Sequence, residues 1–178
     1  MYVHLTDEIF DTIDPYVRGK RGVDFGAGDL QATQMVTKRL QPAAILAIDK
    51  YPARKPLPPP IVFKRALFRD VTCEDVADYR DFAILFWPNI CPFIYDGLKG
   101  VLGQFTTVIY CGTNFDGTAC GWPNLFEYFL SRELLAHVPD QKNSLLVLGN
   151  AQANRRSPTP EEDAGIDRSE IKWEAVWV

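Results

Sequence analysis

Short apolar runs alternate with helix-like and turn-like segments along the whole chain. The uninterrupted apolar runs are typical of parallel strands buried on both faces, and the predicted strands are residues 22–25, 43–48, 61–68, 82–86, 106–110, 144–148 and 172–178. Apolar residues at helical spacing, together with start signals, predict helices over residues 6–14, 30–40, 96–102 and 125–137, and a small one from residue 72. The alternation predicts an α/β fold with a mostly parallel sheet covered on both faces.

Local signals predict where several of these elements begin and end. Thr6 can cap the first helix and Pro15 is a stop signal for it, while Thr72 and Asp75 form a capping-box-like pair. Five prolines between residues 51 and 60 predict a stiff surface loop. Residues 151–168 are polar and predict a second loop. Because no helix separates the last two strands, we expect them to pair antiparallel at one edge.

Polar and turn residues follow several predicted strands. Ligands of open α/β sheets bind beyond the carboxyl ends of the strands, where the strand order reverses. This geometry predicts a site built from five rim segments: the turn at Gly26, Asp49, Asp70, residues 87–89 and residues 111–114.

Composition narrows the class of protein. The 178 residues suit one soluble globular domain, and no apolar run approaches the ~20 residues of a membrane helix. The first ten residues carry acids instead of the basic start of a signal peptide, and four scattered cysteines are typical of reduced thiols, so we expect a cytoplasmic protein. The net charge of −4 means that a nucleic-acid partner would need a local basic patch.

The strongest candidate chemistry is the turn Asp24-Phe25-Gly26-Ala27-Gly28-Asp29, which lies between a predicted strand and a predicted helix. Glycines there allow a sharp turn and close approach to a ligand. Asp49 follows 21 positions after Gly28, at the end of the next strand, where a carboxylate can bind a ribose diol. The pattern favours an adenosine-bearing cofactor; the alternative is an ordinary turn followed by an unrelated solvated aspartate.

Other nucleotide cofactors are less compatible with this turn. Dinucleotide folds need a third small residue where Gln31 stands, and the chain has no GK[ST] motif for a triphosphate. By contrast, VDFGAGDL resembles the glycine loop of class I S-adenosylmethionine-dependent methyltransferases. The resemblance extends to AIDK, FRDV and LFWPN and covers the element order to about Leu148.

The resemblance implies a Rossmann-like methyltransferase fold, a doubly wound sheet of about seven strands with an antiparallel edge strand. It also implies S-adenosylmethionine as cofactor. The implied cofactor-binding residues are Asp24, Gly26, Ala27, Gly28, Asp29, Asp49, Lys50, Asp70, Val71 and Phe86. By their position after the fourth and fifth strands, Trp87, Asn89 and Asn114 are the candidate substrate-binding residues.

Two departures from the family pattern bear on function. Leu30 stands where the family often has a small residue, which suggests a slightly different loop. Phe86-Trp87-Pro88-Asn89 lacks the leading acid or amide of enzymes that methylate base amines, and Cys91-Pro92 reverses the Pro-Cys order of cytosine-carbon methylases.

The sequence leaves alternatives open for two candidate residues and for the function. Trp87 can line a cleft or close the core edge, and Asn114 can contact substrate or simply belong to a turn. The chain can be a methyltransferase acting on an unidentified acceptor, or a catalytically silent binding module with the same fold.

Overall fold

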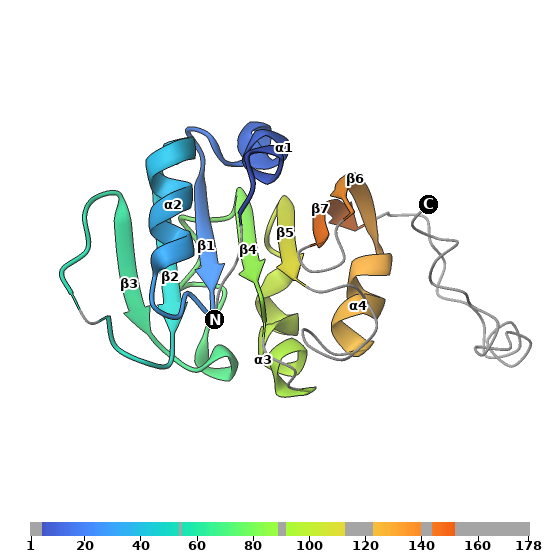
Figure 1. Ribbon diagram of the computed structural model, residues 1–178. Coiled ribbons are helices and arrows are strands. Elements are labelled where there is room, and N and C mark those ends of the chain that lie inside the picture. Colours follow the sequence, from blue (N-terminus) through green and yellow to red (C-terminus); the bar gives the residue numbers. More distant parts are fainter. Residues whose placement is uncertain (1–4, 54, 89–91, 113–122, 140–143, 152–178) are drawn as a thin grey trace, which may run out of the picture.

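The computed structural model describes residues 5–53, 55–88, 92–112, 123–139 and 144–151, which form a seven-stranded sheet between helices (Figure 1). The strand order is β3-β2-β1-β4-β5-β7-β6. The strands are β1 (Arg21–Phe25), β2 (Ala44–Asp49), β3 (Ile61–Arg65), β4 (Phe82–Phe86), β5 (Thr107–Gly112), β6 (Arg132–Val138) and β7 (Ser144–Ala151). The helices are α1 (Asp7–Val17), α2 (Gln31–Leu40), η1 (Phe68–Asp70), α3 (Pro92–Leu102) and α4 (Pro123–Leu130).

The first five strands are parallel, and their register brings their carboxyl ends to one edge. Phe25 pairs with Ile48, Asp49 with Arg65, and Phe86 with Cys111. The chain moves outward from β1 to β3 and then returns to β4 on the other side of β1. The strand order therefore reverses between β1 and β4, beside the glycine turn, as the sequence predicts.

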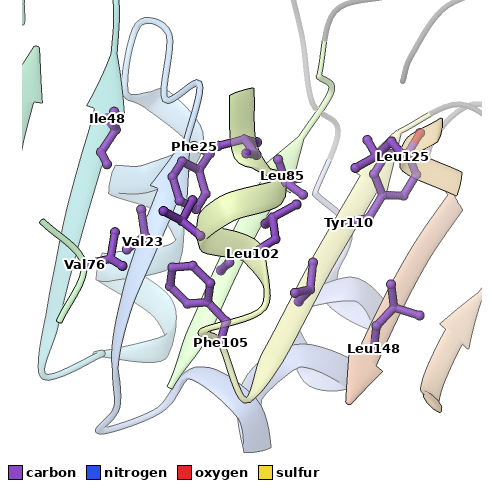
Figure 2. Close-up of a cluster of buried hydrophobic side chains, with 14 of the residues drawn as sticks. Val23, Phe25, Ile48, Val76, Leu85, Leu102, Phe105, Tyr110, Leu125 and Leu148 are labelled. Atoms are coloured by element: carbon purple, nitrogen blue, oxygen red, sulfur yellow. The ribbon is translucent and has the colours of Figure 1, made fainter. Parts of the chain in front are cut away.

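Each face of the sheet buries its own apolar cluster. Helices α1 and α2 cover one face, where Ile13 and Val36 pack against Ile84. Helices α3 and α4 cover the other face, where Leu102 and Leu125 contribute to the core shown in Figure 2. Because both faces are covered, β1, β2, β4 and β5 are almost entirely buried, which explains their unbroken apolar runs.

The predicted start of α1 is confirmed, but its predicted end is wrong. Thr6 accepts a hydrogen bond from the amide of Ile9 at 3.3 Å, as an N-cap does. Pro15, however, lies inside the last turn, and α1 continues to Val17. Val17 is fully buried, and burying its side chain offsets the hydrogen bond that the proline cannot donate.

The prediction of one helix over residues 125–137 is also wrong. Helix α4 ends at Leu130, and the Ser131 amide and hydroxyl both donate to the carbonyl of Tyr128. The following residues form β6, which pairs antiparallel with β7. Residues 132–137 have good helix formers, but backbone pairing with a buried strand overrides that local preference.

Three smaller features of the fold differ from what the sequence predicts. Thr72 and Asp75 make the reciprocal hydrogen bonds of a capping box, yet only turns follow, not a helix. Helix α3 begins at Pro92, four residues before the predicted start. The antiparallel pair at the edge of the described sheet is β6 with β7, not residues 144–148 with 172–178 as predicted, and the predicted strand 172–178 lies outside the described residues.

Candidate functional site

The glycine turn is joined to the end of β2 by three of its backbone amides. The carbonyl of Ile48 accepts hydrogen bonds from Gly26 at 2.8 Å and from Ala27 at 3.2 Å. One carboxylate oxygen of Asp49 accepts from the amide of Gly28 at 2.9 Å, and the other accepts from Tyr51 at 2.8 Å. Each oxygen keeps a second lone pair, so Asp49 can also accept two hydroxyl groups of a ligand.

The turn has a backbone conformation that leaves room beside it. Gly26 and Gly28 have φ angles of +77° and +56°, where glycine is favoured. The nearest atom to a Cβ built on Gly28 would be 3.8 Å away. Leu30, at φ 66°, is also left-handed, and its buried side chain packs with Ala27 and Ala47. The backbone at Leu30 therefore lies in the region that glycine favours.

Asp24 is in β1, directly before this turn, and its side chain lies on the face of the sheet covered by α2. Its side chain is buried and accepts a 2.5 Å hydrogen bond from the hydroxyl of Thr33. Burial raises the pKa of Asp24 from 3.8 to about 6; the Thr33 hydrogen bond lowers it, and the nearby Asp49 raises it. The hydrogen bond with Thr33 links α2 to β1, the two elements that the glycine turn connects.

The remaining predicted cofactor residues are spread around Asp49 and the glycine turn. Asp29 is exposed and accepts from the amide of Gln31 at 3.2 Å, at the start of α2. Lys50 is exposed, with its Nζ 5.0 Å from the centre of the Tyr51 ring. Asp70 has an exposed carboxylate at the end of η1, while Val71 is buried in the core beneath. Asp29, Lys50 and Asp70 can therefore reach solvent at the rim.

The backbone at Trp87 is left-handed, as it is at Leu30. Trp87 follows β4 with a φ angle of 48°, and its amide donates to the carbonyl of Cys111 at 2.7 Å. Left-handed backbone is costly for a bulky side chain and is often found at functional sites. Phe86 before it is buried in the core facing α1 and α2. The predicted substrate residues Asn89 and Asn114 lie outside the described residues.

Three residues that sequence analysis overlooked take part in this arrangement. Thr33 bonds Asp24, the Tyr51 amide bonds Asp49, and Phe68 lies against Gly26. Thr33 lies one turn into the helix after the glycine turn, so its place could have been inferred. No local pattern signals Phe68, because its position depends on how η1 packs.

A hollow of about 590 Å³ lies elsewhere, between α2 and the prolines before β3. Lys38, Pro42 and Pro60 line it. Pro42 and Pro60 precede β2 and β3, so the hollow is at the amino ends of these strands. Asp49 is at the opposite end of β2. The hollow is therefore separate from the candidate site.

Two features are absent from the part of the chain that the structure describes. It contains no group of three or more histidine, cysteine, aspartate or glutamate side chains arranged to hold a metal ion. Among the same residues, no helix combines the length and apolar character needed to cross a membrane.

The architecture is the class I, Rossmann-like methyltransferase fold, and several solved structures share it. The ribosomal protein L11 methylase of Lactobacillus delbrueckii subsp. bulgaricus is 12% identical, with a TM-score of 0.55 over 85% of this chain and 81% of its own. M. capricolum TrmK, in complex with S-adenosyl-homocysteine, is 9% identical, with a TM-score of 0.53 over 90% and 75%. MycE methyltransferase, in complex with Mg, SAH and mycinamycin VI, is 11% identical, with a TM-score of 0.59 over 87% and 52%.

At these identities the likeness concerns the fold alone. No family model matches the sequence, and comparison with curated proteins finds no match.

Proposed function

We propose that the protein binds S-adenosylmethionine and transfers its methyl group to an acceptor bound beside Trp87, at the carboxyl end of β4. The observation that carries the proposal is the position of Asp49, a carboxylate at the carboxyl end of β2 held by the amides of Gly28 and Tyr51. Asp49 lies beside the glycine turn, which follows β1 at the strand-order reversal, where such sheets bind nucleotides. Neighbours with this fold are methyltransferases, two of them in complex with SAH.

The residues present fit the adenosine part of this cofactor. Asp49 would accept the two ribose hydroxyls through its remaining lone pairs. The space beside Gly28 would let the backbone approach the ligand closely. Lys50 and Asp70, both exposed on the rim, would border the adenine.

When bound, the cofactor supplies a methyl group on a sulfonium, which is already a strong electrophile. The protein then has to align the acceptor and exclude water. Trp87 would form the apolar floor of the acceptor cleft, with Asn89 and Asn114 offering polar contacts. A dedicated catalytic base is not required for an acceptor that is already nucleophilic.

The second candidate is a binding module that keeps the fold without catalysis. Phe86-Trp87-Pro88-Asn89 favours it, because this segment lacks the leading acid or amide that grips an amine in base methylases. In this case the Asp49 site would still bind cofactor, but no acceptor would be methylated.

Calorimetric titration with S-adenosylhomocysteine tests the cofactor assignment. We expect Asp49→Ala to weaken binding by on the order of 2–4 kcal/mol, because it removes two charge-assisted hydrogen bonds. Asp49 also accepts two backbone amides, so Asp49→Asn, which keeps one acceptor oxygen, serves as the milder variant. Glu133→Gln, an exposed carboxylate on β6 at the far edge of the sheet, is the control. Equal affinity of wild type and folded Asp49→Ala protein would show that Asp49 does not bind the ribose.

Two further measurements separate the remaining possibilities. Gln31 stands where a dinucleotide fold needs a small residue, so we expect no micromolar binding of a nicotinamide dinucleotide. Release of labelled methyl groups onto pooled small molecules, RNA or proteins would identify an enzyme. Cofactor binding without transfer to any pool would favour the binding module.

A further inference from the structure

Helix α3 packs directly against η1 because residue 97 has no side chain. A Cβ built on Gly97 would lie 3.0 Å from the amide nitrogen of Arg69 and 3.0 Å from Cβ of Phe68. Neither atom is at the end of a flexible side chain, so a substitution could be accommodated only by moving η1 or α3. Gly97 therefore sets the distance between these two elements.

The ring of Phe68 connects η1 to the glycine turn. A Cβ on Gly26 would lie 3.3 Å from Cζ of Phe68. The same ring packs edge-on against Phe25, with ring centroids 6.0 Å apart. Phe68 is only partly buried, so it lies at the boundary between the core and the edge of the sheet.

The segment that carries Phe68 also borders Asp49. The amide of Ala66 donates to the carbonyl of Asp49 at 3.0 Å, and the Arg65 side chain donates to the carbonyl of Lys50 at 3.1 Å. The chain from Arg65 to Asp70 therefore runs from Asp49 toward the glycine turn. It forms a wall that borders both the backbone of Asp49 and Gly26.

We propose that Gly97 is a positioning residue for nucleoside binding, acting through Phe68 to hold this wall at the correct distance from Gly26. The inference rests on the proposed cofactor site, although Gly97 itself belongs to a helix outside that site. An added methyl group would displace Phe68 toward Gly26 or move η1 as a unit. Either movement changes the position of Phe68 and of residues 65–70 relative to Asp49 and Gly26, the residues beside which the nucleoside would lie.

A pair of glycines in α3 provides a matched test. We expect Gly97→Ala to weaken binding of S-adenosylhomocysteine, and of adenosine alone, by a similar factor of about ten, which corresponds to roughly 1.4 kcal/mol. Gly100→Ala should bind as wild type does, because nothing lies within 4 Å of a Cβ at Gly100. Both changes give α3 a better helix former, so propensity alone cannot explain a difference between them.

A double-variant cycle tests whether Gly97 acts through Phe68. We expect Phe68→Leu to weaken binding, and the double variant to lose less than the product of the two single losses. Independent losses would overturn the coupling. If Gly97→Ala does not fold, wild-type affinity in Phe68→Leu would overturn the proposal.

The same titrations distinguish failure of this inference from failure of the cofactor site. If wild-type protein binds and Gly97→Ala binds equally well, the positioning role is wrong and the site stands. If the wild type binds neither ligand, the cofactor site is wrong and the positioning role falls with it.

Discussion

Asp24 is a buried carboxylate whose side chain has one hydrogen-bond partner in the described structure, the hydroxyl of Thr33. A single neutral hydroxyl does not replace the water that an ionised carboxylate loses on burial. The pKa of about 6 follows mainly from this loss, with a smaller contribution from the charge of Asp49. The burial of Asp24 therefore lowers the free energy of unfolding by an amount that depends on pH.

We expect the free energy of unfolding to depend on this group between pH 4 and 6. There the folded state retains a proton that the unfolded state has released, so stability falls as pH rises. Two pKa units correspond to at most about 3 kcal/mol. Asp24→Asn should therefore stabilise the protein by about 1–3 kcal/mol at pH 7.5 and leave it nearly unchanged at pH 4, measured by urea unfolding. Asp29→Asn is the exposed control; an equal gain at both pH values would contradict the assignment.

Trp87 has a left-handed backbone and lies where the acceptor is proposed to bind, at the carboxyl end of β4. If it lines a cleft, Trp87→Ala should lower methyl transfer more than stability. Trp87→Gly should be about 1 kcal/mol more stable than Trp87→Ala, because a left-handed backbone costs an L-residue roughly 1–2 kcal/mol. Thermal unfolding and the transfer assay measure the two effects. A loss of roughly 3–5 kcal/mol in Trp87→Ala, with unchanged transfer, would mean that Trp87 only fills the core.

Among the elements, α4 and β6 are connected to the segment before β5 by one buried arginine, in addition to the pairing of β6 with β7. Arg132 donates to the hydroxyl of Tyr128 at 2.7 Å and to the carbonyl of Phe105 at 2.8 Å. Its guanidinium also lies over the Tyr128 ring, with 5.6 Å between Cζ and the ring centre. The side chain thus connects the end of α4, the start of β6 and the turn that leads into β5.

We expect Arg132→Ala to lower the free energy of unfolding by about 2–4 kcal/mol, because it leaves a buried carbonyl without its donor and creates a cavity. Cofactor affinity of the folded variant should not change, since Phe105 precedes β5 at the edge opposite Asp49. Glu133→Ala, on the exposed side of the same strand, is the control for denaturant unfolding. A parallel loss of S-adenosylhomocysteine affinity would show that the two ends of the sheet are coupled.

For the molecule as a whole, the described sheet has its seven strands by Ala151. Strand β7 fills the position between β5 and β6, antiparallel to both. Among the described residues, both large apolar clusters are made of residues before Gly149. The described residues alone therefore supply seven strands, and the strand predicted over residues 172–178 lies outside them.

A chain truncated after Ala151 should consequently fold. We expect cooperative thermal unfolding, with a loss of less than about 1 kcal/mol and unchanged affinity for S-adenosylhomocysteine, because the seven strands and the glycine turn all lie within residues 5–151. A larger loss would mean that residues 152–178 contribute to the folded core.

Residues adjacent in the sequence are the ones that sequence analysis placed correctly. The buried parallel strands, the cap at Thr6, the glycine turn and the position of Asp49 at the end of β2 all depend on local patterns. Such patterns are informative because period, capping and turn conformation are decided within a few residues.

Only the tertiary structure decided the rest. Residues 132–138 pair with β7 because the edge of the sheet offers backbone partners, although their composition suits a helix. Phe68 lies between Gly26 and Gly97, and Trp87 takes a left-handed backbone beside Cys111, both through contacts between distant segments. These outcomes depend on which surfaces meet after the chain collapses, and the free energy of that packing exceeds the small local preferences that a sequence pattern records.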